Sequence, residues 1–541
     1  MSIIYFHSMN TRGLLLLFVI LSLLGCTNGK SDNEPPKLII SKQSVVIHDI
    51  SALAKPFAFE KTMNKIVATA GGTATNSTEM LKSMIGSFAD GSFIHPISGK
   101  VIEVKSRPLE SAIDPRNLLD PASVDGMIPV GLFNRFDLAP ADGSNCGEYR
   151  IVYAKRSSGP IDRMTMIFES RIPNPNPSKG LEGCAPITDF WAERSKDTNS
   201  AQSISALEKL YYQGIPQVEP IVKAENYGLP MGQIRVNLFK TPKPVEITWT
   251  LREFLVNYDS DGRAILKPEP VDDSPVASLF RATSASSIFS EEERNNFRQS
   301  FLGQPLCNLV NPDRINKKAS AADIINGISA SFDPRFNDFE SISQGNIDNP
   351  ATDTDPLLLN QVQQRLASLS DLSGVSSTQL MNRAGTMTCG GCHQFSADAE
   401  SGNNNLGNNA FWPASLGFVH IDEKGNLSPL LNDFFIPQRI KIAQQFKDKR
   451  TAFHQVKALC PGEAPATESL KIPNVMKSRE HELYKGVDSI RKKIENAIQA
   501  SDAKPDKHQL DSMLKELKEA TDIARKQESA TQGAYAPVRT H

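Results

Sequence analysis

Apolar residues between about residue 40 and residue 290 come in short runs that are typical of β-strands. The runs are rich in Ile, Val, Phe and Tyr and are separated by clusters of Gly, Asp and Pro, which end strands and form turns. The sequence DSDG supplies a turn before the last run. We therefore expect neighbouring antiparallel strands at 128–138, 149–155, 164–172, 234–239, 245–258 and 263–268.

Two segments of the same region are instead expected to be helical. Residues 57–69 place four apolar side chains on one helix face. Asn76 with Glu79 resembles a capping box that opens a second helix towards Phe88. We expect residues 40–289 to form an α+β or mostly β domain.

The periodicity becomes helical after residue 290. Residues 478–541 repeat apolar positions every three or four residues on both sides of Pro505, which predicts a terminal αα-hairpin. Further helices are expected at 290–303, 357–369, 377–386 and 437–457, within a mainly helical region over 290–470. The expected fold class is α+β, with a β-rich N-terminal domain and a mainly helical C-terminal region.

The composition is that of a globular protein. At 541 residues, with 39% hydrophobic and 22% charged residues, the chain is long enough for two or three folded units. Its formal net charge of -2 provides no broad positive field for attracting nucleic acid. We therefore expect no nucleic-acid partner.

The N-terminus predicts export. Arg12 precedes the apolar run GLLLLFVILSLLG, which has the length of a signal-peptide core and is short for a membrane-spanning helix. The run ends in LLGC, and Leu23 to Cys26 resembles the lipobox of bacterial lipoproteins. This resemblance implies a signal peptide over 1–25, lipidation of Cys26 and a lipid anchor in a bacterial membrane, with the protein facing the periplasm or the cell exterior. Residues 26–39 then form a polar tether. A plain secretory signal or a membrane anchor is the other interpretation.

The most specific chemical signal is the segment TMTCGGCHQFS, which contains Cys389, Cys392 and His393. On a helical turn, positions i and i+3 lie close together. Two thiols can therefore reach the two vinyl groups of one porphyrin while the next residue turns its imidazole to the iron. The pattern C-x-x-C-H resembles the haem-attachment signature of c-type cytochromes. The resemblance implies one covalent haem c, with Cys389 and Cys392 as attachments and His393 as the proximal iron ligand.

Two other interpretations of the C-x-x-C pair stay open. Gly-Gly between the cysteines also suits a zinc knuckle, for which His420 and Cys460 are the candidate further ligands, although a second C-x-x-C is missing. The pair can also close as a disulfide or act as a redox thiol pair. The segment before it predicts a helix and a loop rather than the strand that a thioredoxin-like site requires.

Within the haem interpretation, the sixth iron ligand is open. His420 lies in WPASLGFVHID, whose apolar residues are suited to lining a haem. The alternation of Val419, His420 and Ile421 equally allows an imidazole that faces solvent. The next methionines, Met476 and Met513, lack the usual setting of a haem ligand. The alternatives are His420, an open or water-bound iron, and a methionine.

The remaining cysteines are Cys146, Cys184, Cys307 and Cys460. We expect them to form two disulfides, because an exported chain meets oxidising conditions. Proximity in the sequence favours Cys146 with Cys184 and Cys307 with Cys460, but four cysteines allow three connectivities.

These features together predict a lipid-anchored, exported c-type haem protein that transfers electrons to or from a partner protein, rather than a catalyst. A peroxidase-like oxidoreductase is one alternative, and it requires an exchangeable sixth position with an acid/base group nearby. The other is a haem-free surface binding or assembly lipoprotein, with the C-x-x-C as a disulfide and the terminal hairpin as its docking element.

Overall fold

The computed structural model describes residues 38–450, apart from short gaps at 74, 157–158, 160, 229, 244–247, 283–287, 317, 345–348, 370–371, 373, 396–401 and 403, and from the side chains of residues 315, 394 and 395. Several predictions fall outside the described residues, namely the signal peptide 1–25, Cys26, most of the tether 26–39, Cys460, Met476, Met513 and the hairpin 478–541. Contacts divide the chain after Ile39, and Ile40 with the described residues that follow it forms one unit. Within residues 38–450, no helix combines the length and the apolar character needed to cross a bilayer.

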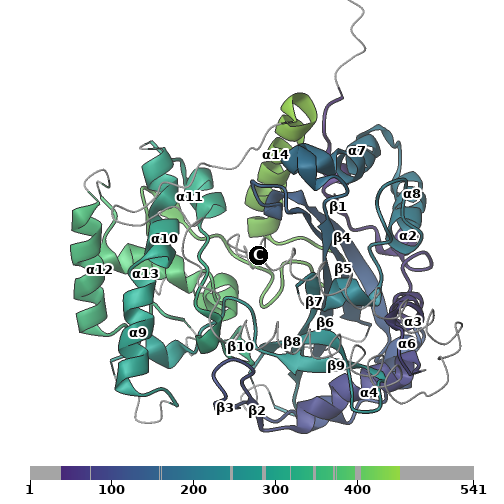
Figure 1. The fold of residues 1–541 in the computed structure, drawn as a ribbon, viewed down its shortest axis with the longest axis horizontal. Helices are drawn as coiled ribbons and strands as arrows, with labels where there is room; N and C mark the ends of the chain where they lie inside the picture. Colours follow the sequence, from purple (N-terminus) through teal and green to yellow (C-terminus); the bar gives the residue numbers. More distant parts are fainter. Residues whose placement is uncertain are drawn as a thin grey trace, which may run out of the picture. The chain divides into compact units, whose positions relative to one another are not determined.

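An antiparallel sheet of eight strands organises the unit that begins at Ile40 (Figure 1). The strand order is β1-β4-β5-β6-β7-β8-β10, and β9 pairs with β8. The strands are β1 (Val46–Ile47), β4 (Met127–Arg135), β5 (Asn145–Lys155), β6 (Asp162–Pro173), β7 (Gly232–Lys240), β8 (Thr250–Tyr258), β9 (Ala264–Glu269) and β10 (Ser341–Ile342). Two small hairpins pair β2 (Ser92–Ile94) with β3 (Val101–Glu103) and β11 (Asn405–Gly407) with β12 (Ala410–Phe411). The six expected strands and the α+β class are confirmed.

The two faces of the large sheet differ in chemistry, because neighbouring side chains along a strand point to opposite sides. On the helix-covered face, apolar and aromatic side chains pack into a core that includes Tyr149, Ile151, Tyr153, Met166, Phe168, Ile234, Val236 and Phe254. The opposite face, which we call the site face, carries the buried polar side chains Arg150, Thr165, Glu169, Arg235 and Asn237. The polar residues that alternate with apolar ones along these strands are therefore buried rather than exposed to solvent.

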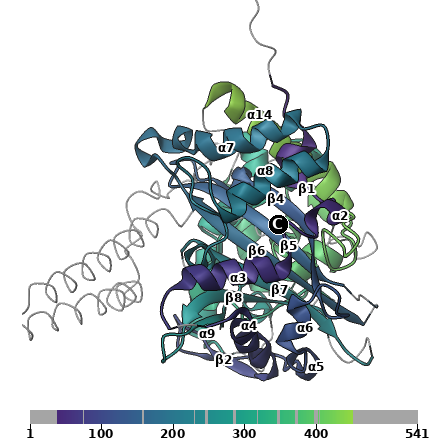
Figure 2. The same cartoon turned by 90° about the vertical axis from the view of Figure 1, so that its right-hand side faces the viewer.

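Four longer helices cover the helix-covered face, and Figure 2 shows them in front of the strands. They are α3 (Phe59–Ala70), α4 (Ser77–Gly86), α7 (Ala185–Ala192) and α8 (Ser200–Tyr212). The Asn76 side chain accepts a hydrogen bond from the backbone N–H of Glu79 at 2.9 Å, which confirms the predicted N-cap of α4. Shorter helices on the chain are α2 (Ile50–Leu53), α5 (Pro108–Ser111) and α6 (Pro115–Leu119).

A second group of helices lies on the other side of the sheet (Figure 1) and shares a core with Val130, Phe133 and Val152 of its strands. It comprises α9 (Glu291–Phe301), α10 (Gln304–Ile315), α11 (Ala321–Gly327), α12 (Pro356–Ser368) and α13 (Ser377–Gly385). The chain then continues into the π-helix η11 (Leu430–Phe435) and α14 (Ile436–Lys449). The predictions at 290–303, 357–369 and 377–386 correspond to α9, α12 and α13, and α14 begins as expected. The sequence did not predict α10, whose Pro312 lies inside the helix, where proline is ordinarily excluded.

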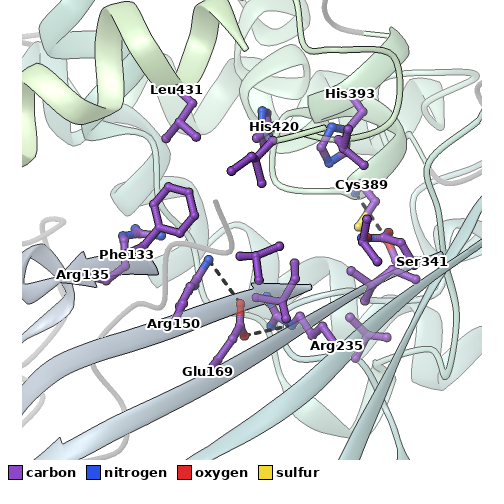
Figure 3. A pocket seen from close by; sticks show the side chains of 18 of the residues that line it. Phe133, Arg135, Arg150, Glu169, Arg235, Ser341, Cys389, His393, His420 and Leu431 are labelled. Atoms are coloured by element: carbon purple, nitrogen blue, oxygen red, sulfur yellow. Dashed lines mark hydrogen bonds and ion pairs between the residues drawn. The ribbon is translucent and has the colours of Figure 1, made fainter. Parts of the chain in front are cut away.

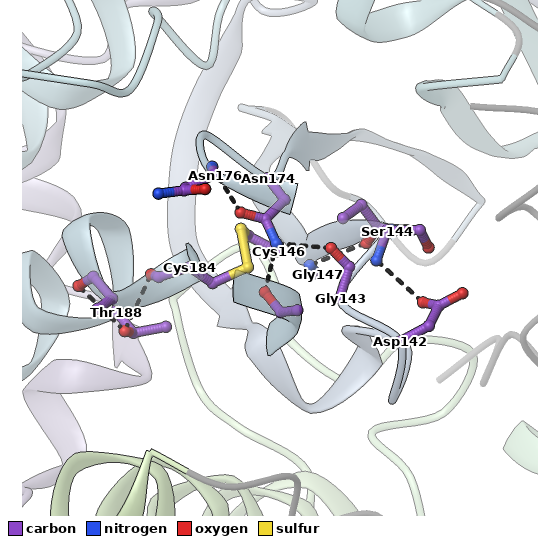
Figure 4. The surroundings of a disulfide bond; sticks show 12 residues. Asp142, Gly143, Ser144, Cys146, Gly147, Asn174, Asn176, Cys184 and Thr188 are labelled. Carbon is purple, nitrogen blue, oxygen red and sulfur yellow. Dashed lines mark hydrogen bonds between the residues drawn. A yellow bond between two sulfur atoms is a disulfide. The ribbon is translucent and has the colours of Figure 1, made fainter. Parts of the chain in front are cut away.

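A disulfide joins Cys146 to Cys184 (Figure 4), which is the pairing that sequence proximity favours. It ties the start of β5 to the residue before α7, and so fastens a helix to the sheet. Beside it, the side-chain amide of Asn174 donates to the carbonyl oxygen of Gly143 at 2.6 Å. Cys307 is also disulfide-bonded, but its expected partner lies outside the described residues.

Candidate functional site

The C-x-x-C-H motif follows α13 directly and begins a short turn of its own. Thr388 caps this turn, because its hydroxyl accepts a hydrogen bond from the backbone N–H of Gly391 at 3.1 Å. The same hydroxyl donates to the carbonyl oxygen of Gly385, the last residue of α13, at 2.9 Å. One threonine thus connects the motif to the helix before it.

Gly391 permits the close approach of this turn to α13. A Cβ atom at this position would lie 1.8 Å from the carbonyl oxygen of Gly385, so no side chain fits there. From Gly391 to Phe395 the backbone forms a π-helical turn, a conformation that is frequent at functional sites. A glycine that is unfavourable in an ordinary helix is therefore required here by packing.

Cys392 is fully buried and is held from two sides. The indole N–H of Trp412 donates to the Cys392 carbonyl oxygen at 2.9 Å, and His420 Nε2 lies 3.2 Å from Cys392 Sγ. Burial raises the pKa of the Cys392 thiol well above its ordinary value, and the neighbouring Cys389 adds to the shift. The structure contains both cysteines as thiols rather than as a disulfide.

The imidazole of His393 packs against that of His420, with ring centroids 4.4 Å apart and ring planes tilted by 36°. Its Nδ1 atom is buried and has no hydrogen-bond partner among the described residues. Burial lowers the pKa of His393 to about 4, so the ring is neutral at neutral pH, which is the form that binds metals. The candidate ligand atoms of Cys392, His393 and His420 lie within 4.8 Å of one another.

A cavity lies between this motif and the site face of the sheet (Figure 3). The space that the centres of water molecules can occupy is about 120 Å³, and the volume is about 1000 Å³ when space open to solvent is included. Cys389, His393 and His420 line one side. Apolar side chains fill much of the remaining wall, namely Phe133, Val152, Ile167, Leu251, Val271, Met387, Val419, Ile421, Leu431 and Phe435.

The charged side chains that line the cavity have a positive balance. Four arginines, at positions 135, 150, 235 and 439, stand against Glu169 and Asp272. Glu169 lies between two of the arginines, with its Oε1 3.2 Å from Arg150 Nη1 and its Oε2 3.5 Å from Arg235 Nε. The Arg–Glu–Arg group spans three neighbouring strands and forms the floor of the cavity in Figure 3.

Each of these two arginines has a further carboxylate partner. Glu148 accepts a hydrogen bond from Arg150 Nε, and Glu253 Oε2 lies 3.1 Å from Arg235 Nε. Burial alone would lower the pKa of both guanidinium groups, but the surrounding carboxylates raise it, so both stay charged. Burial also raises the pKa of Glu253 to about 8, so this carboxyl is largely protonated at neutral pH.

The structure brings His420 to the motif but in a different setting from the one that alternation suggests. Val419, His420 and Ile421 all line the cavity, because the segment is held by isolated bridges rather than by a regular strand. His420 Nδ1 lies 3.0 Å from Ser428 Oγ, while its Nε2 contacts Cys392. A distal iron ligand has to face His393 across the porphyrin, so His420 would have to move to take that position. Its role as the sixth ligand stays a prediction.

The charged residues of the site face have only a weak signal in the sequence. Arg150 and Arg235 occupy alternate positions of strands, where a charged side chain ordinarily faces solvent. Their relation to Glu169 emerges only from the register, which pairs Arg150 with Glu169 on the next strand. Sequence reasoning therefore found the motif side of the cavity and missed the sheet side.

The chain was compared with protein-family models, characterised proteins and solved structures, and none of them matches it. Its function must therefore be argued from the geometry and chemistry of this site.

Proposed function

We propose that this protein carries one covalent haem c in the cavity between the C-x-x-C-H motif and the site face, and that it transfers electrons. The observation that carries the proposal is the placement of Cys389 and His393 together on the wall of a cavity lined by apolar side chains and arginines. Cys389 and Cys392 would hold the porphyrin through thioether bonds, and His393 would bind the iron. A haem bound there supplies reversible one-electron chemistry.

The side chains around the cavity fit such a group. His393 is neutral at neutral pH, and its buried Nδ1 has no partner among the described residues. Apolar side chains such as Val152 and Ile167 suit the faces of a porphyrin, and the arginines suit its carboxylates. Cys392 contacts His420 rather than lining the cavity, so attachment requires its side chain to turn.

The residues on the sheet side of the cavity limit which side chains could bind the sixth position of the haem iron. Among the described residues that line the cavity, the strands contribute no His, Met or Cys. This supports an iron whose sixth position is exchangeable, or one that His420 reaches after moving. Visible spectra with and without carbon monoxide, for the wild type and for His420→Ala, separate the two. An exchangeable position binds carbon monoxide in both proteins and favours the peroxidase-like alternative, whereas ligation by His420 makes the variant alone bind readily.

The test of haem attachment is a haem stain on a denaturing gel after export from a host that matures a control cytochrome. We expect a stained band in the wild type and a weakened or missing band in Cys389→Ala. His420→Ala is the matched control, because attachment needs only the two cysteines and His393, so its band should remain. An unstained wild-type protein beside a stained control cytochrome would overturn the proposal.

A zinc centre is the second candidate, and it is favoured by the approach of Cys392, His393 and His420 to within 4.8 Å of one another. Zinc binds sulfur and nitrogen at about 2.0–2.3 Å, so three such ligand atoms need little movement to share one ion. Metal analysis of the unstained protein tests it. A zinc centre predicts one zinc per chain that His420→Ala releases, which is the opposite of the result expected for haem.

We further propose that Cys26 is lipidated and anchors the exported protein to a bacterial membrane, where it meets a redox partner protein. The support is the lipobox-like sequence LLGC, and acyl chains provide stable anchoring without a spanning helix. Cell fractionation tests it. The wild type should be recovered with membranes and Cys26→Ala in the soluble fraction, and equal recovery of both with membranes would contradict the lipid anchor.

A further inference from the structure

The floor of the cavity contains guanidinium donors that have no hydrogen-bond partner among the described residues. Arg150 is 8% exposed and Arg235 is 4% exposed, and both side chains line the cavity. The Nη2 atom of each guanidinium is buried and has no hydrogen-bond partner among the described residues. A buried charged donor without a partner is costly, so this pair calls for an acceptor.

The protein's own carboxylates occupy other atoms of these two arginines. Glu148 and Glu169 take Nε and Nη1 of Arg150, while Glu253 and Glu169 approach Nε of Arg235. The acidic side chains thus hold both guanidinium groups and leave the buried Nη2 atom of each without a partner among the described residues. Figure 3 shows Arg150 rising from the sheet towards the side that holds His420.

We propose that Arg150 and Arg235 form an anion site for carboxylates on the sheet side of the cavity. Guanidinium groups bind carboxylates through directional, charge-assisted hydrogen bonds. Two sources offer this chemistry, namely the carboxylates of an attached haem and a free small carboxylate that enters the cavity. The first source rests on the proposed function, whereas the site itself does not.

The positive balance of the cavity supports the site. Its lining contains four arginines and two carboxylates, and Glu253 is largely protonated at neutral pH because burial raises its pKa to about 8. Glu253 therefore adds little negative charge beside Arg235 at neutral pH, where Glu169 and Asp272 are among the other acidic groups that act on this arginine. An incoming carboxylate meets a fixed cationic floor that needs little rearrangement to bind it.

The test uses the exported full chain as Arg150→Gln, Arg235→Gln and the two Arg→Lys variants. Arg163→Gln is the matched control, because Arg163 lies on β6, pairs with Glu423 at 2.8 Å and does not line the cavity. Thermal unfolding followed by circular dichroism selects folded proteins. If a glutamine variant fails to fold, the lysine variant at that position replaces it, with a partial effect expected.

The first readout is the reduction potential of the stained protein. If haem carboxylates occupy the site, both glutamine variants keep covalent haem but shift to a lower potential than Arg163→Gln, because loss of a nearby positive charge favours the oxidised form. The lysine variants should lie in between. In that case, the haem-loaded wild type should not bind added succinate.

The second readout is calorimetric titration with succinate, for the haem-loaded chain and for Cys389→Ser/Cys392→Ser without haem. Binding to the haem-loaded wild type that is lost in both glutamine variants assigns the site to a free carboxylate. Binding only to the haem-free chain assigns it to the haem carboxylates. A wild type without haem would overturn the proposed function, yet its succinate binding still tests the anion site. Two results together would overturn the site. The reduction potentials would be unchanged in both glutamine variants, and succinate would bind to no form of the protein or would bind regardless of both arginines.

Discussion

The two faces of the large sheet are built from the same strands but bury different kinds of side chain. Phe168 points to the helix-covered face and packs with Phe59, Tyr153 and Tyr227 at ring-centroid distances of 5.5–6.1 Å. Its neighbour Glu169 points to the site face and pairs with arginines. Apolar burial stabilises one face, whereas compensated charges occupy the other. Neighbouring residues of one strand thus belong to an apolar core on one face and to a charged cavity wall on the other.

The largest expected effect comes from breaking the helix-covered face. Phe168→Ala should lower the free energy of unfolding by about 4 kcal/mol, because it removes a fully buried ring and leaves a cavity. Ile167→Ala is the matched control on the site face, where the side chain already borders an open cavity, and it should cost about 1 kcal/mol. Urea denaturation measures both, and equal losses would remove the distinction between the faces.

On the site face, Glu169→Gln should lower the stability of the protein and strengthen its binding of succinate. It removes the carboxylate shared by Arg150 and Arg235 and should lower the free energy of unfolding by about 3 kcal/mol. The same change should tighten the binding of succinate to the haem-free chain, because two less neutralised guanidinium groups face the cavity. Chemical denaturation measures the free energy of unfolding, and calorimetry measures the affinity for succinate. Weaker succinate binding in a folded Glu169→Gln protein would contradict the anion site.

Between pH 5 and 8, two carboxyl groups near the site face and the buried imidazole of His393 should affect stability in opposite directions. Burial raises the pKa of Glu253 to about 8 and that of Asp273 to about 7. A carboxyl group with a raised pKa contributes stability that is complete below its ordinary pKa and is lost as the pH rises through its folded value. From pH 5 to pH 8, Glu253 and Asp273 should each lower the free energy of unfolding by about 3 kcal/mol, and His393, whose pKa is lowered to about 4, should raise it by about 2 kcal/mol, so that it falls overall.

The helix-covered face supplies the contrast for this pH experiment. Its buried tyrosines, among them Tyr149 and Tyr227, have pKa values that burial raises above their ordinary value, so they stay neutral throughout. Glu253→Gln should flatten the pH dependence measured by urea denaturation. A profile as steep as that of the wild type would locate the titrating group elsewhere.

The smallest expected effect concerns the turn that presents the motif to the site face. Thr388→Val should lower the free energy of unfolding by about 1 kcal/mol, because it leaves the N–H of Gly391 and the carbonyl oxygen of Gly385 without the threonine hydroxyl. Thr378→Val, at an exposed position of α13, should have almost no effect on the melting temperature. Equal melting temperatures for the two variants would argue against Thr388 as a cap.

The sequence predicted the features that depend on residues close together in the chain. Runs of β-branched and aromatic residues located the strands, Asn76 located a helix start, and Cys389, Cys392 and His393 located the motif. The cavity depends instead on tertiary packing, since it requires the register of β5 to β7 and the return of residues 412–421 to the motif. The sequence did not predict α10, because Pro312 lies inside this helix and a proline inside a helix ordinarily ends it. Nothing in the sequence indicated that Arg150 is buried either, because the second layer of helices that covers its face comes from distant parts of the chain.

The hydrogen bond from Trp412 to the carbonyl oxygen of Cys392 has a consequence for the order of events during maturation. Residues 412–421 leave the ribosome after the motif, and in the folded protein the Cys392 thiol is completely buried with His420 of this segment against it. Any reagent or enzyme that acts on this sulfur therefore has a limited time window. It must act before the segment docks, or wait until the segment opens again. The folding rate of a short loop, rather than the reactivity of the thiol, would then set the yield of the finished protein.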